Sequence, residues 1–157
     1  MTFSSSYYDV NQSVVVLKGT KIASVHSLAK LKDFKFGAQL GTTSYDFIKN
    51  TIKASQGPAV FDTNDDAVQA LKNKQIDGLV VDLPTAFYVT AVQVEGSIVL
   101  GQFAAPAGGE HFGMVFEKGN PLAGCVDKAI ATLRKNGTLA KIQSQWLAKA
   151  TGAPLIK

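Results

Sequence analysis

The sequence predicts an α/β fold with a mostly parallel sheet flanked by helices. Between Val14 and Leu100, short β-branched or apolar runs alternate with segments whose apolar residues recur every three or four positions. The runs predict buried strands, and the periodic segments predict helices that cover a sheet. A chain of 157 residues is long enough for one domain or two small lobes with a real core.

Six segments have the composition expected of strands. The first is rich in β-branched residues, the second stops at Gly41, and the third follows a break at Pro58. The fourth is an apolar run that ends in an acid, Asp82. The expected strands lie at 12–18, 34–40, 59–61, 76–82, 97–100 and 112–116.

Six segments are expected to be helical, each with a recognisable start or stop. Ser27 is a plausible N-cap, acids occupy the first turn of the third helix, and Pro84 suits the first turn of the fourth. The last two helices are separated by Asn136-Gly137, and Trp146 is expected on the apolar side of the second of them. The expected helices lie at 27–32, 45–54, 62–71, 84–90, 122–135 and 138–150. Residues 103–109 are expected to be a connection.

Composition excludes several classes of function. The net charge is +4, but the sixteen Lys and Arg residues are scattered and include a single arginine, Arg134, which argues against a nucleic-acid partner. Cys125 is the only cysteine, so no internal disulfide or cysteine metal cluster is expected, and its apolar helical surroundings predict a buried structural thiol. No other metal site and no cofactor is expected. No apolar run of eighteen residues predicts a membrane span, and the first residues do not resemble a signal peptide.

The turn after the second strand is a candidate anion site. Gly41 ends the strand, and Thr42, Thr43 and Ser44 open the next helix. Unpaired N–H groups and the helix dipole favour an anion at such a start. No lysine follows at P-loop spacing, so a small carboxylate suits the site better than a nucleotide. The alternative is that these hydroxyl side chains only cap the helix.

Asp82 is the second candidate, because it ends another strand of the same predicted sheet. Ligands of α/β sheets collect at the carboxyl ends of the strands, where the two candidates would meet. Helix-start donors would then hold an α-carboxylate, and Asp82 would pair with an α-ammonium. The alternative for Asp82 is a cap on the helix that begins near Pro84.

Seven segments, in order, resemble one protein family along essentially the whole chain. The segments are Phe3-Ser-Ser-Ser-Tyr-Tyr, Val14-Val-Val-Leu-Lys-Gly, Ser27-Leu-Ala-Lys-Leu, Gly37-Ala-Gln-Leu-Gly-Thr-Thr, Ile76-Asp-Gly-Leu-Val-Val-Asp, Phe112-Gly-Met-Val-Phe-Glu-Lys-Gly-Asn-Pro-Leu and Asn136-Gly-Thr-Leu-Ala-Lys-Ile with Trp146. The family that they resemble is that of the polar amino-acid solute-binding proteins of ABC importers, known as solute-binding family 3, with the periplasmic-binding-protein type II fold.

The resemblance implies a non-enzymatic, two-lobed protein outside the cytoplasm. Such a protein closes on an amino acid by hinge motion and delivers it to an ABC permease in the membrane. Residues 13–107 resemble the complete second lobe, whereas 1–12 and 108–157 resemble hinge crossings and a remnant of the first lobe. The crossings would lie near 8–12 and 108–112.

The resemblance also assigns roles at the candidate site. Thr43 would hold the α-carboxylate through its backbone and hydroxyl, and Asp82 would hold the α-ammonium. Gln39, Gly41, Thr42 and Ser44 would complete the ligand-binding set. Tyr7 or His111 would either lie at the edge of the cleft or serve only as hinge packing.

The chain departs from the family pattern at its start. The opening part of the first lobe is missing from the resemblance, with the aromatic residue that covers the ligand side chain and the arginine that clamps the carboxylate. We therefore expect a half-cleft with weak affinity. The helices at 122–135 and 138–150 would lack the sheet they normally cover, which predicts a homo-oligomer, with domain swapping as one route.

Two other functions remain open at this stage. One is a structural or oligomerising fragment that binds no ligand. The other is an enzyme on the same fold, similar to cyclohexadienyl dehydratases, for which Asp82, Glu110 and His111 are the only candidate acids or bases.

Overall fold

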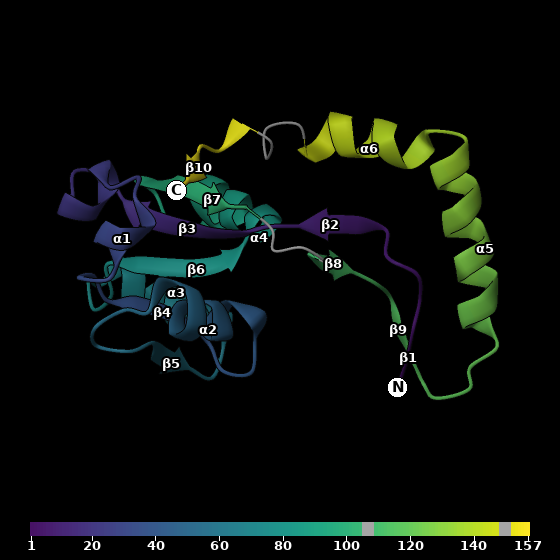
Figure 1. The fold of residues 1–157 in the computed structure, drawn as a ribbon, viewed down its shortest axis with the longest axis horizontal. Coiled ribbons are helices and arrows are strands. Elements are labelled where there is room, and N and C mark those ends of the chain that lie inside the picture. The colour runs from purple at the N-terminus through teal and green to yellow at the C-terminus, as the bar shows by residue number, and fades with distance from the viewer. Residues whose placement is uncertain (105–108, 148–151) are drawn as a thin grey trace. The chain divides into compact units, whose positions relative to one another are not determined.

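The computed structural model describes residues 1–104, 109–147 and 152–157, which form two compact units. The sheet unit comprises 11–104 and 153–157. The helical unit comprises 1–10 and the described residues of 105–152. Each unit has its own strands and helices (Figure 1).

The sheet unit is built on six strands in the order β10-β7-β3-β6-β4-β5. The central strand, β3, runs antiparallel to both of its neighbours, β6 and β7, and every other pair is parallel. The predicted mostly parallel sheet is therefore confirmed, with β3 as the exception. The strands are β3 (Gln12–Leu17), β4 (Phe36–Gln39), β5 (Ala59–Phe61), β6 (Gly78–Asp82), β7 (Ser97–Phe103) and β10 (Leu155–Ile156).

Helical segments connect these strands. Two of the helices change from α to π geometry without a break, so α2 and α4 each continue for five more residues. The helix predicted at 45–54 begins two residues earlier, at Thr43, because Thr42 is its N-cap. The segments are η1 (Lys21–Ser24), α1 (Leu28–Leu31), α2 (Thr43–Phe47) with η2 (Ile48–Ile52), α3 (Asn64–Lys72), and α4 (Leu83–Tyr88) with η3 (Val89–Gln93).

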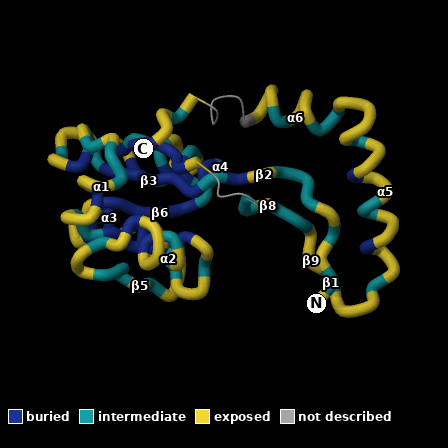
Figure 2. Tube along the Cα trace, viewed as in Figure 1, coloured by how far each residue is buried: buried dark blue, intermediate teal, exposed yellow. Residues whose placement is uncertain are grey.

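Side chains that alternate along β3 divide the core into two layers. Val14 and Val16 face one layer, and Val15 faces the other. The first layer includes residues of η1, α1 and η2, and the second includes residues of α3 and α4. Helices thus cover both faces of the sheet, and the buried strands run between them in Figure 2.

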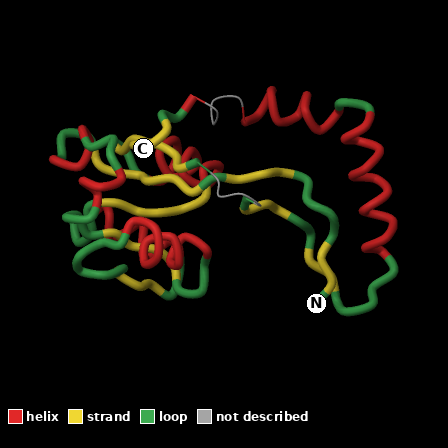
Figure 3. The backbone as a smooth tube through the Cα atoms, in the orientation of Figure 1, coloured by secondary structure: helices red, strands yellow, loops and turns green. Residues whose placement is uncertain are grey.

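The helical unit contains two antiparallel strand pairs and two helices (Figure 3). Strand β1 (Thr2–Phe3) pairs with β9 (Val115–Phe116), and β2 (Tyr8–Val10) pairs with β8 (Glu110–Phe112). The strand predicted at 112–116 is therefore interrupted at 113–114. Helix α5 (Leu122–Lys135) has the predicted bounds. Helix α6 (Thr138–Leu147) starts where predicted, and residues 148–150 lie outside the described part of the chain.

Polar contacts fasten the two helices to the N-terminal segment of the same unit. The Ser5 N–H donates to the Asp127 carboxylate at 2.6 Å, and the Arg134 guanidinium donates to the Ser6 carbonyl at 2.6 Å. The Gln143 amide donates to the Tyr7 carbonyl at 3.2 Å. These contacts hold α5 and α6 against a segment more than a hundred residues away in sequence.

The prediction that Cys125 is buried is wrong, because the thiol is exposed. The packed stripe of α5 passes through Ala123, Val126 and Ile130, and Cys125 lies off that stripe. Trp146, on α6, is 73% exposed. The apolar composition of α5 indicated that one side of the helix is packed, but it did not show which side.

The last residues of the chain belong to a different unit from the one expected from the sequence, which assigned all of 108–157 to the first lobe. Residues 153–157 belong to the sheet unit, because β10 pairs with β7 and Ile156 is buried in its core. A two-residue strand has no periodic signal, so the sequence did not predict it. The expected boundary at 107 and 108 falls outside the described residues. No described helix is both long and apolar enough to cross a membrane.

Gly78, the first residue of β6, is packed so closely that a side chain would not fit there. A Cβ there would lie 2.7 and 2.8 Å from two ring atoms of Phe36 and 3.0 Å from Val14. We expect Gly78→Ala to lower the free energy of unfolding by about 1–3 kcal/mol, because Phe36 is fully buried and has nowhere to move. Urea denaturation followed by far-UV circular dichroism measures this change.

Gly124→Ala is the matched control for that variant. Gly124 lies inside α5 with nothing within 4 Å of an added Cβ. Alanine favours a helix interior over glycine by about 1 kcal/mol, so this variant should be at least as stable as the wild type. Equal stability of Gly78→Ala and the wild type would contradict the packing described here.

Candidate functional site

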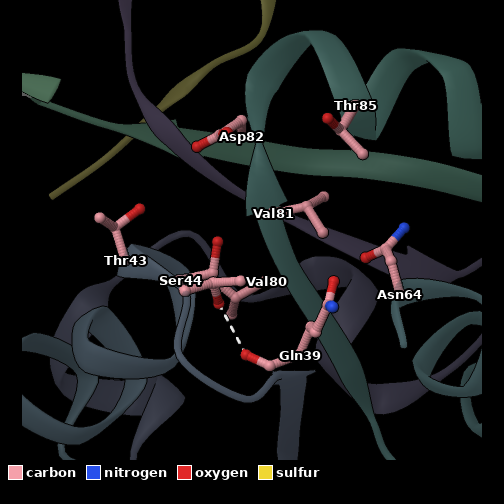
Figure 4. Close-up of a pocket in the computed structure, with 9 residues that line it drawn as sticks. Gln39, Thr43, Ser44, Asn64, Val80, Val81, Asp82 and Thr85 are labelled. Carbon is pink, nitrogen blue, oxygen red and sulfur yellow. Dashed lines mark hydrogen bonds between the residues drawn. The ribbon is translucent and has the colours of Figure 1, made fainter. Parts of the chain in front are cut away.

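A pocket of about 270 Å³ lies where the carboxyl ends of β4 and β6 meet the first turns of α2, α3 and α4. Because helices lie on both faces of the sheet, their starts converge on this edge. Five of the six predicted site residues line the pocket, and Gly41 does not. The lining residues are Gln39, Thr42, Thr43, Ser44, Asn64, Val80, Val81, Asp82 and Thr85 (Figure 4).

Gly41 and Thr42 shape the turn that leads into α2. Gly41 has a φ of +74°, a conformation that L side chains rarely adopt, and it reverses the chain after β4. The Thr42 hydroxyl accepts from the Tyr45 N–H at 3.2 Å and donates to the Gln39 carbonyl at 2.7 Å, the dashed line in Figure 4. The capping interpretation is therefore correct for the Thr42 hydroxyl.

Thr43 and Ser44 occupy the first two positions of α2, and both contact the buried side chain of Gln12. The Ser44 hydroxyl donates to Gln12 Oε1 at 2.7 Å, and Gln12 Nε2 donates to Thr43 Oγ1 at 3.2 Å. Ser44 is buried, whereas Thr43 is exposed at the pocket. Their hydroxyls do not act as the N-cap, which is Thr42.

Asp82 is the last residue of β6 and the N-cap residue of α4, but its side chain makes no capping hydrogen bond. Its Oδ1 instead accepts a hydrogen bond from Gln12 Nε2 at 2.8 Å. The capping alternative therefore does not describe this carboxylate. The side chain is half-buried and lines the pocket together with Thr43.

Asn64 and Thr85 complete the lining, and neither was predicted from the sequence. Asn64 is the first residue of α3, three residues after the end of β5, and Thr85 lies in the first turn of α4. In Figure 4 their side chains lie around the pocket with those of Thr43 and Asp82. Applying the strand-end argument to β5 as well as to β4 and β6 would have identified Asn64.

The lining groups suit a small polar molecule with charge of both signs. Asp82 is the acidic group of the lining, and hydroxyl and amide groups supply hydrogen-bond donors around it. The first turns of the helices add backbone N–H groups that lack intrahelical partners. Among the described residues, no group of three or more His, Cys, Asp or Glu side chains is placed to hold a metal ion.

The remaining candidates from sequence lie in the helical unit. Tyr7 lines a separate pocket of about 250 Å³ there, and burial raises the pKa of the neighbouring Tyr8 hydroxyl above its usual 10.0. Glu110 and His111 lie on β8, and His111 is exposed. The three candidate acids or bases of the enzyme hypothesis are thus divided between the two units, with Asp82 in the sheet unit.

The family model of the bacterial extracellular solute-binding proteins, family 3, matches residues 1–149. The chain belongs to this family. The resemblance found in the seven sequence segments is thereby confirmed.

Individual family members agree with this assignment. The chain is 28% identical over 158 residues to a protein named as a probable histidine-binding protein of Neisseria gonorrhoeae, covering 97% of this chain and 56% of that one. It is 30% identical over 147 residues to the ABC transporter glutamine-binding protein GlnH of Bacillus subtilis, covering 92% and 51%. The chain therefore spans about half the length of these curated family members.

A solved family structure confirms the predicted periplasmic-binding-protein type II fold. An ancestral arginine-binding protein bound to glutamine is 35% identical and superposes with a TM-score of 0.73. The match covers 92% of this chain and 62% of that one. The α/β unit with its mostly parallel sheet is thus the expected lobe architecture of the family.

The Thr42 cap leads to a stability prediction for the pocket wall. We expect Thr42→Ala to lower the free energy of unfolding by about 1 kcal/mol, because it leaves the Tyr45 N–H without its capping acceptor. Thr42→Ser keeps the hydroxyl and should lose much less. Chemical denaturation of the three proteins measures the difference, and equal losses in both variants would contradict the capping role.

Proposed function

We propose that the pocket binds an L-α-amino acid and that the chain acts as the solute-binding component of an amino-acid ABC importer. The observation that carries this proposal is that the hydroxyl-rich start of α2 and the Asp82 carboxylate line one pocket. These groups complement the two charges that every amino acid carries. Family membership and the amino-acid-binding names of family members support the same ligand class.

In the proposed complex, each charge of the ligand has a partner in the sheet unit. The α-carboxylate lies at the first turn of α2, where Thr43 and Ser44 offer N–H groups at the positive end of the helix. Gln39 and Thr42 border this position, and Gly41 shapes the turn that leads to it. The α-ammonium lies against Asp82, which is a charge-assisted contact.

The affinity of this pocket is expected to be low. Asp82 is only half-buried, so solvent screens its attraction for an ammonium group. The cost of immobilising the ligand must then be offset by few contacts. We expect a dissociation constant on the order of 1 mM, which corresponds to about −4 kcal/mol.

The remaining parts of the proposal concern partners and location. The family consists of extracellular solute-binding proteins, so we place the chain outside the cytoplasm, in the periplasm or at the cell surface. There it would pass its ligand to a membrane permease. We propose binding without chemical turnover. The family members compared are named as binding proteins. Among the residues that line this pocket, Asp82 is the one side chain that could act as an acid or base.

Ligand titration tests the amino-acid proposal. We expect L-glutamine, L-arginine or L-histidine at millimolar concentration to shift the NMR signals of Thr43 and Ser44. Asp82→Asn should weaken this binding about tenfold or more, because it removes the charge that faces the ammonium. N-acetylation of the ligand, which also removes the ammonium charge, should have a similar effect.

Asp33→Asn is the matched control, because Asp33 is exposed and does not line the pocket. It should bind as the wild type does. If none of the three amino acids perturbs the pocket at millimolar concentration, the binding proposal is wrong. Equal binding by Asp82→Asn and the wild type would remove Asp82 from the site.

We also propose that the chain self-associates through its helical unit. Among the described residues of that unit, the buried apolar side chains are Val10, Ala123 and Ile130 alone. Seven large apolar side chains of the same described part are exposed, and exposed apolar side chains that gather in one patch favour association. A second copy presents the same surface, so a symmetric pair would cover both. The exposed residues are Met1, Phe3, Met114, Val115, Leu122, Ile142 and Trp146.

Sedimentation velocity tests this association. We expect the wild-type chain to sediment above its monomer mass of 16.6 kDa, and Ile142→Glu to shift it towards the monomer by placing a charge on the exposed side of α6. Val92→Glu introduces the same charge at an exposed apolar residue of the sheet unit and should leave the mass unchanged. A wild-type chain that is monomeric at every concentration would contradict the proposal.

A further inference from the structure

We infer that Gln12 is a positioning residue for this site, holding the Asp82 carboxylate and the Thr43 hydroxyl in one fixed arrangement. The inference rests on the proposed amino-acid function, because it assigns how that pocket is kept ready for its ligand. Gln12 does not itself line the pocket. It acts through the two groups that do.

Strand pairing places Gln12 where it can reach both groups. Gln12 begins β3 and lies directly opposite Asp82, the last residue of β6, in the antiparallel register. Opposed residues of an antiparallel pair point to the same face of the sheet. That face is the one covered by α2, since Val14, two residues further along β3, packs with Ile48 and Ile52.

The hydrogen bonds of Gln12 define the orientation of its amide. Nε2 donates to Asp82 Oδ1 at 2.8 Å and to Thr43 Oγ1 at 3.2 Å, and Oε1 accepts from the Ser44 hydroxyl at 2.7 Å. An ionised carboxylate only accepts hydrogen bonds, so the NH₂ side of the amide must face Asp82. The oxygen side is then left facing Ser44.

One planar, buried group therefore joins two pocket walls that are distant in sequence. Gln12 is 4% exposed, so its hydrogen bonds are sheltered from competing water. Holding Asp82 and Thr43 in single rotamers before a ligand arrives removes part of the ordering cost of binding. This is the physical contribution that we assign to Gln12.

A purely structural role explains this residue less well. Strands β3 and β6 are already joined by five paired residues, and an apolar side chain would fill the same space without burying an amide. Gln102 shows what a structural glutamine does in the same unit. It is 8% exposed, accepts from the Asn11 amide at 2.8 Å and donates to the Ala153 carbonyl at 2.9 Å, away from the pocket lining.

The test compares Gln12→Met with Gln102→Met in the full chain. Both variants replace a buried glutamine by a side chain of similar size without its hydrogen bonds. Scalar couplings measured by NMR report the χ1 rotamers of Asp82 and Thr43 without any ligand. We expect single rotamers in the wild type and in Gln102→Met, and averaged rotamers in Gln12→Met.

Titration with L-glutamine, L-arginine and L-histidine supplies the second measurement. We expect Gln12→Met to bind about tenfold more weakly than the wild type, and Gln102→Met to bind as the wild type does. In the Asp82→Asn background, Gln12→Met should cost much less, because residues that act through one another are not additive. Gln12→Asn, whose amide is one methylene shorter, replaces Gln12→Met if the latter does not fold.

The outcomes separate this inference from the function on which it rests. If Asp82 and Thr43 keep single rotamers in the Gln12 variant, or if that variant binds as tightly as the wild type, Gln12 is structural only. If the rotamers average as expected but the wild type binds no amino acid, the positioning role stands and the proposed ligand class is wrong.

Discussion

The antiparallel pairing of β3 with β6 is the constraint on which the rest of the sheet unit depends. It joins the strand that enters the unit to the strand that ends at the pocket, and its register sets Gln12 opposite Asp82. The same pairing defines the two core layers, because alternate valines of β3 face helices on opposite sides of the sheet. A slip of one residue in β6 would turn its side chains towards the opposite layers and move Asp82 to the other face, away from Gln12. Sheet register and pocket geometry are therefore one property of this unit.

The pocket shows how capping and binding divide among similar side chains. Thr42 uses its hydroxyl as the cap of α2, whereas Thr43 and Ser44 contact Gln12. Asp82 occupies the cap position of α4 without capping it, and its carboxylate accepts from Gln12. Neighbouring residues of nearly identical chemistry thus have separate tasks, and backbone position decides which task each performs.

The sheet unit buries its apolar residues in two layers, whereas the described part of the helical unit buries few.

Much of the fold followed from local pattern. The alternation of apolar runs and periodic segments correctly indicated an α/β unit, and the bounds of β5 and α5 matched the structure. The misses have specific causes. Strand β10 is too short for a periodic signal; it pairs with β7, and its Ile156 packs beside Gly101 in the core. Cys125 lies beside the packed stripe of its helix, and only the contacts of α5 show where that stripe runs.

The sequence by itself determined the family, the order of the elements, and the two strand ends that carry Asp82 and the threonine-rich turn. These features depend on residues close together in the chain, where steric preference, capping and periodicity act. The strand-end rule also predicted that these two ends would meet, as they do in the pocket. Tertiary structure alone decided that Asn64 and Thr85 join them and that Gln12 lies between Asp82 and Thr43. Those are contacts between residues far apart in the chain. They arise from strand order and register, which no local pattern specifies.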